Sequence, residues 1–411
     1  MIRLCFTYVA VLIAALLLSS VSHASLSIDT QIRLIAGYNP QGPEANSPEV
    51  LQITQSSGWK QAAARNSMAA VMRNSAGFFS PAAVAKMSSY FAANTAESFN
   101  NARNVLYFFG GADALYPSVL FPNQKRLLIV GLETPGQIFD AERMAAQGSL
   151  VSQMSAVATA WKDLVTISFF ITKHMSTDLQ QFGTSTMIAV GLVARGNTIT
   201  SVQAVSLDRN GQLTTAAGRE RGVQIQYVKP NGQRADVIYF SMDLSDGSLR
   251  SKPEFVSFVQ NNGFDTAYYK AASYVSHNHG FEGLNRLVLN TVQHVVENDD
   301  GIPFDSLREN AQAWDLKLFG IYSTPSQLFG AHVDQDLLTE YDQAICASND
   351  SENLAIWRRQ WRDACHRPQT NFGFASLKWG GTLPFRYGYT WQTSASGVKA
   401  KFSNMIVLDR H

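Results

Sequence analysis

The chain has 411 residues, of which 45% are hydrophobic and 16% are charged, and its formal net charge is +1. A balanced charge argues against the basic surface of nucleic-acid-binding proteins and against the acidic composition of solvating, disordered segments. The length and the apolar content predict a globular protein with one large domain or two closely packed domains.

The N-terminal residues have the three parts of an export signal. Arg3 supplies a positive charge, an apolar run follows over residues 4–18, and "SHA" at 22–24 has the small-x-small pattern of a cleavage site. We therefore expect a signal peptide at 1–24, with an uncleaved membrane anchor as the alternative. We expect no later transmembrane segment, so the mature protein is predicted to be periplasmic or secreted.

The first part of the mature chain is predicted to be irregular and then helical. Residues 25–55 include three prolines in "YNPQGPEANSPEV", which is typical of an arm or linker. Helices are predicted over 59–74 and 81–100, and the second begins with the favourable pair Ser80-Pro81.

Two continuous apolar runs come next, at 104–111 and 126–133. Continuous runs are typical of strands that are covered on both faces, as in parallel sheets. A helix is predicted between 138 and 176, because apolar residues recur there at helical spacing and form one core-facing side.

The pattern changes again between residues 187 and 250. Strand-like runs are separated there by turns that include Asn-Gly and Asp-Gly, which predicts an antiparallel meander over 187–243. Further along, the pattern predicts helices at 253–260, 265–276, 281–291, 325–330 and 333–345, and strands at 292–297, in "WDLKLFGIY" and in the aromatic tail from 371.

Together these elements predict a mixed α/β (α+β) fold. A central sheet would combine buried parallel strands with the antiparallel meander, and helices would pack on it. We expect residues 56–411 to form a single large α/β domain, with two intimate subdomains, 56–186 and 187–411, as the alternative.

Two cysteines remain after the predicted cleavage, Cys346 and Cys365. An even pair in an oxidising compartment predicts a disulfide, with two free thiols as the alternative. The bridge would close a loop of about 20 residues and stabilise the fold by about 3 kcal/mol in the chain-entropy model. A cysteine-based metal site is not supported, because the sequence has no Cys-x-x-Cys motif.

Several blocks along the chain form one pattern: FFGGADALYP, GLETPG, YFSMDLSDGSL, KAASYVSH, ENDDGIPF, WDLKLFGIY and LPFRYGYTW. This pattern resembles the signature blocks of an exported bacterial protein family of unknown function. The resemblance covers roughly residues 104–392 and implies a secreted bacterial protein, but it implies no activity. One histidine of the family pattern matches His277, whereas His279 has no counterpart, which argues against a metal site built on both.

Acidic residues follow several of the predicted strands. Asp113 follows the first apolar run, and Glu133 ends the second. Asp243 ends the last strand of the meander, and Asp299 and Asp300 follow a later strand. If these strands are parallel neighbours, their carboxylates meet at the edge where helix-flanked sheets bind ligands.

Carboxylates that meet in this way have two chemical uses. They shift one another's pKa values, so that a protonated acid stands beside an ionised base, and they bind divalent cations. Asp299 and Asp300 point to a site most directly, because one aspartate suffices for a turn and two adjacent ones repel each other. The alternative is that all these acids only form turns and helix caps.

Other polar and aromatic residues leave two interpretations each. His277 and His279 would hold a metal from an extended segment, or would end the helix predicted at 265–276. Lys270 is predicted on an aromatic helix face, either snorkelling to water, the commoner case, or buried and paired. The aromatic residues of 371–391 would stack on a sugar or pack in the last sheet.

The sequence therefore predicts an exported bacterial protein that binds a ligand or hydrolyses an envelope substrate in an acidic cleft. The suggested cofactor is a divalent cation, no nucleic-acid partner is expected, and the sequence does not identify any other partner. The alternative is a non-catalytic structural or interaction protein of the cell envelope. The cleft would be lined by Asp113, Glu133, Asp243, Asp299 and Asp300, with His277 nearby.

Overall fold

The computed structural model describes residues 26–74, 79–136, 140–167, 183–218, 220–270, 272–320, 322, 335–348, 374, 377–385, 387 and 404–411. The predicted signal peptide, the helix predicted at 325–330 and Cys365 lie outside these residues.

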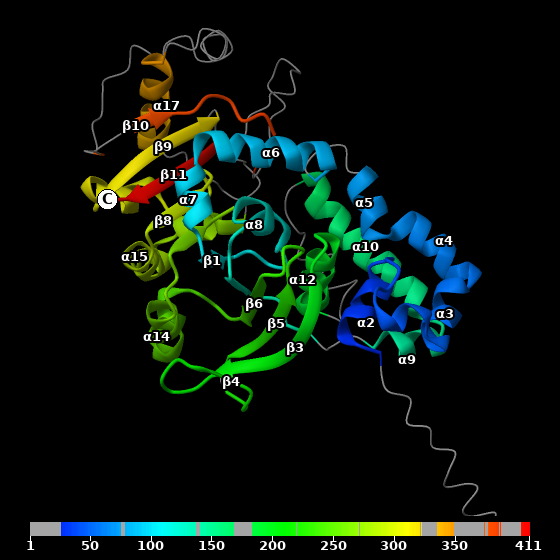
Figure 1. Cartoon of the computed structure of the whole chain (residues 1–411). Coiled ribbons are helices and arrows are strands. Elements are labelled where there is room, and N and C mark those ends of the chain that lie inside the picture. Colours follow the sequence, from blue (N-terminus) through cyan, green and yellow to red (C-terminus); the bar gives the residue numbers. More distant parts are fainter. Residues whose placement is uncertain are drawn as a thin grey trace, which may run out of the picture.

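The strands of the described residues form one sheet across the protein (Figure 1). They are β1 (Asn104–Phe108), β2 (Arg126–Gly131), β3 (Thr198–Leu207), β4 (Leu213–Thr214), β5 (Arg221–Val228), β6 (Arg234–Ser241), β7 (Thr266–Tyr268), β8 (His294–Glu297), β9 (Trp314–Gly320), β10 (Leu377–Trp379) and β11 (Asn404–Arg410). In the described part of the chain the sheet has 11 strands in the order β10-β9-β11-β8-β7-β1-β2-β6-β5-β3-β4.

The sheet is parallel in the middle and mixed toward its edges. The central strands β8, β7, β1, β2 and β6 are parallel, and β10 is parallel to β9. In contrast, β11 is antiparallel to both of its neighbours, and β6, β5, β3 and β4 form the antiparallel meander. The mixed α/β fold class predicted from the sequence is confirmed.

The central strands are apolar throughout because both of their faces are covered. In β1, Val105 and Tyr107 point into one hydrophobic core, whereas Leu106 and Phe108 point into a second core on the opposite face. Successive side chains of a strand alternate between its two faces, so a strand between two cores has no polar positions.

Helices form the two outer layers. They are α2 (Ile28–Ile35), α3 (Pro48–Gln55), α4 (Ser57–Asn66), α5 (Met68–Asn74), α6 (Pro81–Asn94), α7 (Ala96–Asn101), α8 (Leu115–Leu120), α9 (Ala141–Ala146), α10 (Leu150–Ile167), α12 (Gly183–Ala194), α13 (Asp246–Arg250), α14 (Pro253–Asn261), α15 (Glu282–Thr291), α16 (Phe304–Arg308) and α17 (Gln335–Cys346), with the 3-10 helices η1 (Pro43–Asn46), η2 (Ala272–His277), η3 (His279–Phe281) and η4 (Ala311–Ala313). The helices α2 to α12 contribute to one core, and α13 to α17 contribute to the other (Figure 1). Within the described ranges, no helix combines the length and hydropathy that a membrane crossing needs.

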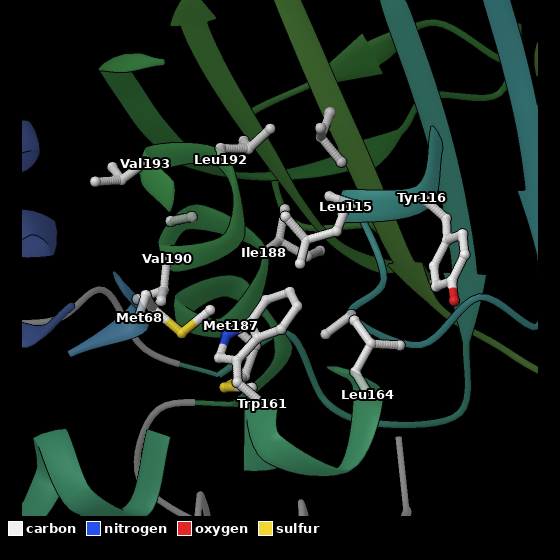
Figure 2. Packing of buried hydrophobic residues seen from close by; sticks show 14 of the residues in the cluster. Met68, Leu115, Tyr116, Trp161, Leu164, Met187, Ile188, Val190, Leu192 and Val193 are labelled. Atoms are coloured by element: carbon white, nitrogen blue, oxygen red, sulfur yellow. The ribbon is translucent and has the colours of Figure 1, made fainter. Parts of the chain in front are cut away.

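The first core is built around Trp161 of α10, which is completely buried. Figure 2 shows its indole beside Met187 and Leu164. A Cβ atom at Gly191 of α12 would lie 2.7 Å from this ring, so glycine is needed for the two helices to approach so closely. The apolar side predicted for the helix between 138 and 176 is therefore a core face.

The N-terminal arm differs from its prediction. Residues 25–55 were expected to be irregular, but α2 and α3 form there, each capped by a serine side chain. The prolines do not interrupt these helices, because Pro48 occupies the first turn of α3, where its missing N–H costs nothing. Arg33 of α2 is buried, and its guanidinium donates to the carbonyl of Asn197 at 3.2 Å.

Two further segments have the opposite structure to the one expected. The run 187–194, expected to be the first strand of the meander, belongs to α12. A helix that is buried on all sides has no polar face, so its sequence cannot be distinguished from that of a buried strand. Residues 265–276, expected to be a helix, contain β7 and η2; three residues of strand are too few for a recognisable pattern.

Candidate functional site

The candidate site lies at the carboxyl ends of the parallel strands. Because β1, β2, β6, β7 and β8 run in the same direction, the segments that leave them gather at one edge, and all five predicted acids lie in these segments. The strand order also reverses here, since β2 lies on one side of β1 and β7 on the other. Such a switch point is where helix-flanked sheets bind ligands.

A strained turn follows β1 at this edge. Phe109 has φ of 61°, and Gly111 has φ of 55°, so two residues of "FFGG" adopt the left-handed conformation. For a residue with a side chain this conformation costs on the order of 1 kcal/mol and is uncommon outside functional or tightly constrained sites. The turn folds the chain back over the end of the strand and brings Asp113 into the interior.

Asp113 forms a buried ion pair with Lys270, the second residue after β7. The Lys270 Nζ lies 2.9 Å from the Asp113 Oδ2, and their side chains are 1% and 2% exposed. The Tyr107 hydroxyl donates to Oδ2 at 3.1 Å, and the Tyr116 backbone N–H donates to Oδ1 at 3.1 Å. The pair therefore joins the ends of two neighbouring strands, and both oxygens of the Asp113 carboxylate accept hydrogen bonds.

Lys270 also lies against an aromatic ring, with its Nζ 3.3 Å from the centroid of Tyr116, a cation–π contact. Burial lowers the pKa of Lys270 to about 8, although Asp113 favours the charged form. The expectation of a snorkelling lysine on a helix face was wrong. The paired, buried alternative holds, because the chain turns into the interior directly after β7.

Buried tyrosines extend this cluster toward β8. The ring centroids of Tyr107 and Tyr268 are 4.6 Å apart, and those of Tyr268 and Tyr387 are 6.4 Å apart. Burial raises the pKa of Tyr387, and the charges of Asp113 and Glu297 raise it further, although a hydrogen bond with Tyr268 opposes them. The pKa of Tyr387 is thus raised by acids near the ends of two different strands, Asp113 after β1 and Glu297 at the end of β8.

The turn after β8 folds around the carboxylate of Glu297, which is completely buried. The Glu297 Oε2 accepts the backbone N–H of Ile302 at 2.7 Å. A Cβ atom at Gly301 would lie 2.3 Å from this oxygen, so the glycine of "ENDDG" is required by the closeness of the carboxylate. Glu297 therefore shapes the segment that carries the two aspartates.

The carboxyl groups of Asp299 and Asp300 share one hydrogen-bond donor. The Asn298 side-chain amide donates to the Asp299 Oδ1 at 3.1 Å and to the Asp300 Oδ2 at 2.9 Å. The Asp299 backbone N–H donates to the Asn404 Oδ1 at 2.9 Å, which ties the turn to β11. The amide holds the two acids side by side, so their charges interact directly.

The surroundings of this pair favour protonation. Burial raises the pKa of Asp299 to about 6, although hydrogen bonds from Asn404 and Asn298 oppose the shift. Burial raises the pKa of Asp300 well above its ordinary value, and the charge of Asp299 raises it further. Burial thus raises both pKa values, and the charge of Asp299 adds to the shift of Asp300, so the two carboxyl groups differ as an acid and a base require.

Two predicted acids lie apart from these clusters. The backbone carbonyl of Glu133 accepts the Tyr239 hydroxyl at 2.7 Å, and its partly exposed carboxylate lies 3.5 Å from the same hydroxyl. Asp243 is exposed, and its carboxylate accepts the backbone N–H and the hydroxyl of Ser245, both at 2.8 Å. The contacts of Asp243 are those of a turn-forming residue.

The two histidines have different surroundings. His277 is partly buried and ends η2, whereas the His279 side chain is fully exposed, with its Nδ1 3.2 Å from the Glu282 Oε1. Among the described residues, no three or more His, Cys, Asp and Glu side chains are grouped closely enough to hold a metal ion. A divalent cation thus remains a prediction from the sequence.

The sequence did not reveal several residues of the site. Glu297 and the tyrosines at 107, 268 and 387 look like core or turn residues in their local context, and for Lys270 the sequence offers a buried, paired alternative without identifying the partner. One signal was available, because a lysine directly after the apolar run "TAYY" is either at the surface or buried with a carboxylate. The partner itself cannot be read from the sequence, since Asp113 lies far away along the chain.

No protein-family model matches the chain, and neither a curated protein nor a solved structure is similar to it. The resemblance to an exported bacterial family therefore depends on the sequence blocks alone. Function has to be argued from the chemistry of the residues at the carboxyl edge of the sheet.

Proposed function

We propose that the protein binds or hydrolyses a polar envelope substrate at the carboxyl edge of β8, with Asp299 and Asp300 as its acid–base pair. The observation that carries this proposal is the shared amide donor, Asn298, which contacts both carboxyl groups at 3.1 Å and 2.9 Å. Two carboxyl groups held together with unequal pKa values divide the roles of proton donor and proton acceptor.

The different environments of the two acids suggest their roles. Asp300 is 7% exposed, and burial together with the charge of Asp299 raises its pKa well above the ordinary value, so we assign it the role of the general acid. Asp299 is partly exposed and, with a pKa of about 6, is ionised at neutral pH. It acts as the base that activates water, or as one ligand of a divalent cation.

The Asp113–Lys270 pair supports this site from the neighbouring strands. Both side chains are buried beneath the edge, so they hold the ends of β1 and β7 in position and are not expected to contact the substrate. Through the tyrosine cluster they also lie next to Glu297, whose carboxylate shapes the aspartate turn. Asp113 and Lys270 are therefore positioning residues in this proposal.

We also propose that the protein is exported and that it has a disulfide, as the sequence predicts. The signal peptide at 1–24 directs export, and the mature protein belongs to the exported bacterial family that it resembles. Cys346 ends α17, and its predicted disulfide partner, Cys365, lies outside the described residues. A disulfide between them fits the oxidising compartment.

The test uses the purified mature chain and three classes of chromogenic probe: carboxylic esters, phosphate monoesters and glycosides. Hydrolysis is followed from about pH 4 to about pH 9, and metal content is measured before and after chelation. We expect at least one class to be hydrolysed, with a rate that rises as the base of the pair ionises. We expect Asp299→Asn with Asp300→Asn to reduce this rate by about 100-fold or more.

The control is Asp243→Asn, which makes the same chemical change at an exposed turn of the same edge and should leave the rate unchanged. The proposal fails if no probe class is hydrolysed and no metal copurifies. It also fails if the double aspartate variant is as active as the parent protein.

One observation favours the non-catalytic alternative, an interaction protein of the cell envelope. Leu132, directly after β2, is 75% exposed, which is unusual for a large apolar side chain. If this edge binds a protein or envelope component, Leu132→Ser will weaken cosedimentation with envelope fractions, while Asp299→Asn will not.

A further inference from the structure

A pocket lies at the opposite edge of the sheet from the acid pair, at the amino ends of β1, β2 and β6. Its volume is about 540 Å³, and its lining includes Lys125, Thr200, Gln226 and Arg234. Small-molecule sites are typically about 300 to 1,000 Å³, so the pocket is large enough for a monosaccharide-sized ligand. Its lining is mainly polar and charged, which favours a polar ligand.

The single acid of this lining is already neutralised. Asp236 accepts hydrogen bonds from the Arg126 Nε at 3.0 Å and from the Arg126 Nη2 at 2.7 Å, and the Gln224 side-chain amide donates to it at 2.8 Å. Bidentate arginine–carboxylate pairs are rigid, so Arg126 and Asp236 form a fixed part of the pocket lining that has no net charge. Asp236 therefore does not repel an anion that enters the pocket.

The other two cationic side chains of the lining have no partner within the described residues. Lys125 and Arg234 are exposed, and within the described residues neither of their side chains forms a hydrogen bond or an ion pair. The Asp236 backbone N–H donates to the Lys125 carbonyl at 2.9 Å, which places the segments that carry the two cations side by side. Two positive charges thus face a concave surface without a balancing acid.

Neutral polar groups complete the lining. In the described part of the chain, the side chains of Thr200 and Gln226 make no hydrogen bond, and both are exposed. A hydroxyl and an amide can each donate and accept, as the hydroxyl groups of a sugar require. In contrast, the Asn104 amide is occupied, since it donates to the carbonyls of Asn262 and Gly263 at 3.1 Å and 3.0 Å.

A neighbouring lysine is consistent with a positive potential at this edge. The Lys229 Nζ donates to the carbonyls of Pro122 and Gln124 and is therefore a structural contact. Burial, and then the charge of Arg103, lowers the pKa of Lys229 to about 8. Lys229 and Arg103 thus add positive charge near the pocket, while the Asp265 carboxylate at the same edge accepts the backbone N–H groups of Arg103 and Asn104.

We propose that this pocket binds an anionic sugar, whose phosphate or carboxylate group contacts Lys125 and Arg234 and whose hydroxyl groups contact Gln226 and Thr200. This site is separate from the acid pair, because the two lie at opposite edges of the parallel strands. We assign it binding alone, since the acid of the described lining, Asp236, is paired with Arg126.

The test is calorimetric titration of the full mature chain with glucose 1-phosphate, glucuronate, inorganic phosphate and glucose at low salt. We expect saturable binding of glucose 1-phosphate, of glucuronate or of both, and at least tenfold weaker binding of glucose and of inorganic phosphate. The two charged sugars distinguish a phosphate from a carboxylate ligand. The affinity should fall at higher salt, because the contact is between exposed charges.

The variant Lys125→Gln with Arg234→Gln should weaken binding at least tenfold. The matched control is Lys60→Gln with Arg65→Gln, which removes two exposed positive charges from α4 and should leave the affinity unchanged. Asp299→Asn should also leave it unchanged, which separates this site from the proposed acid–base pair. The proposal is overturned if no anionic sugar binds saturably, if glucose binds equally well, or if the pocket variant retains the parent affinity.

Discussion

At the carboxyl edge of the parallel strands Lys270 is 1% exposed and paired with Asp113, whereas at the amino edge Lys125 and Arg234 are exposed and have no side-chain partner among the described residues. The same type of charge thus has two different roles in one sheet. A buried charge is tolerated only with a partner, so it mainly positions the elements around it. An exposed, unpaired charge contributes little to stability and remains available for a ligand.

The acids differ between the edges in the same way. Burial raises the pKa of Asp299 to about 6, and the hydrogen bonds from Asn404 and Asn298 offset this shift only in part. Asp409, which pairs in register with His294 at the start of β8, is also partly buried, but hydrogen bonds from His294, Lys317 and Ser98 outweigh the effect of burial and lower its pKa to about 2. The partners of an acid, and not its burial alone, decide whether it stabilises the fold at neutral pH.

The largest expected effect comes from breaking the buried pair. Lys270→Met leaves the carboxylate of Asp113 buried without its cation, and we expect a loss of about 3 to 5 kcal/mol in the free energy of unfolding. Urea denaturation followed by tyrosine and tryptophan fluorescence measures this loss. The double variant Lys270→Met with Asp113→Leu should recover part of it, and a double variant as unstable as the sum of the two single variants would contradict a direct pairing.

An intermediate effect is expected at the Asp409 cluster. The Lys317 Nζ and the His294 Nδ1 lie 2.6 Å and 2.9 Å from the carboxylate, and the Ser98 hydroxyl also donates to it. A lowered pKa adds stability above the ordinary pKa of about 3.9, and this stability is lost as the pH falls through about 2. Asp409→Asn should therefore cost about 2 kcal/mol at pH 7, and the difference from the parent protein should vanish in strong acid.

Thermal unfolding between about pH 2 and pH 7 measures this difference. The matched control is Asp305→Asn, which removes an exposed carboxylate, 72% exposed, that lies 3.0 Å from the Arg308 Nη2. We expect the control to change the stability by less than about 0.5 kcal/mol at every pH. If Asp305→Asn lowered the stability as much as Asp409→Asn does, burial and hydrogen-bond geometry would not explain the loss at Asp409.

The acid pair should show the opposite pH dependence. A folded-state pKa that is raised above the unfolded value gives stability that is present below the unfolded pKa and is lost as the pH rises through the folded pKa, here about 6 for Asp299. Asp299→Asn with Asp300→Asn should therefore raise the stability at pH 7 by about 1 to 2 kcal/mol, with no gain near pH 4. Melting temperatures measured over this range test the sign, and a variant less stable at neutral pH would contradict it.

The smallest effect is expected at the amino edge. Lys125→Gln with Arg234→Gln removes two cations, twice the charge removed by Lys270→Met. We nevertheless expect the unfolding free energy to change by less than about 0.5 kcal/mol, because neither side chain has a partner within the described residues. A decrease of more than about 1 kcal/mol in the unfolding free energy, measured in the same urea titration, would mean that these cations stabilise the fold and are not available for a ligand.

Much of the fold was predictable because its signals are local. The continuous apolar runs at 104–111 and 126–133 predicted the buried strands β1 and β2, and the glycine turns predicted the antiparallel strands β3, β5 and β6. The acids after these strands were also readable as a pattern. In contrast, the local pattern predicts a strand where α12 forms and a helix where β7 forms, because a fully buried segment shows no polar periodicity and a three-residue strand shows no pattern at all.

The sequence by itself therefore determined the fold class, most of the elements and the positions of acids at strand ends, all of which depend on neighbours along the chain. Only the tertiary structure decided that β1 lies between β2 and β7, and hence that Asp113 meets Lys270 while Asp243 remains in an exposed turn. The physical reason is that strand order results from the packing of helices and strands far apart in sequence. Burial and partners, which set each pKa, exist only after that packing is complete.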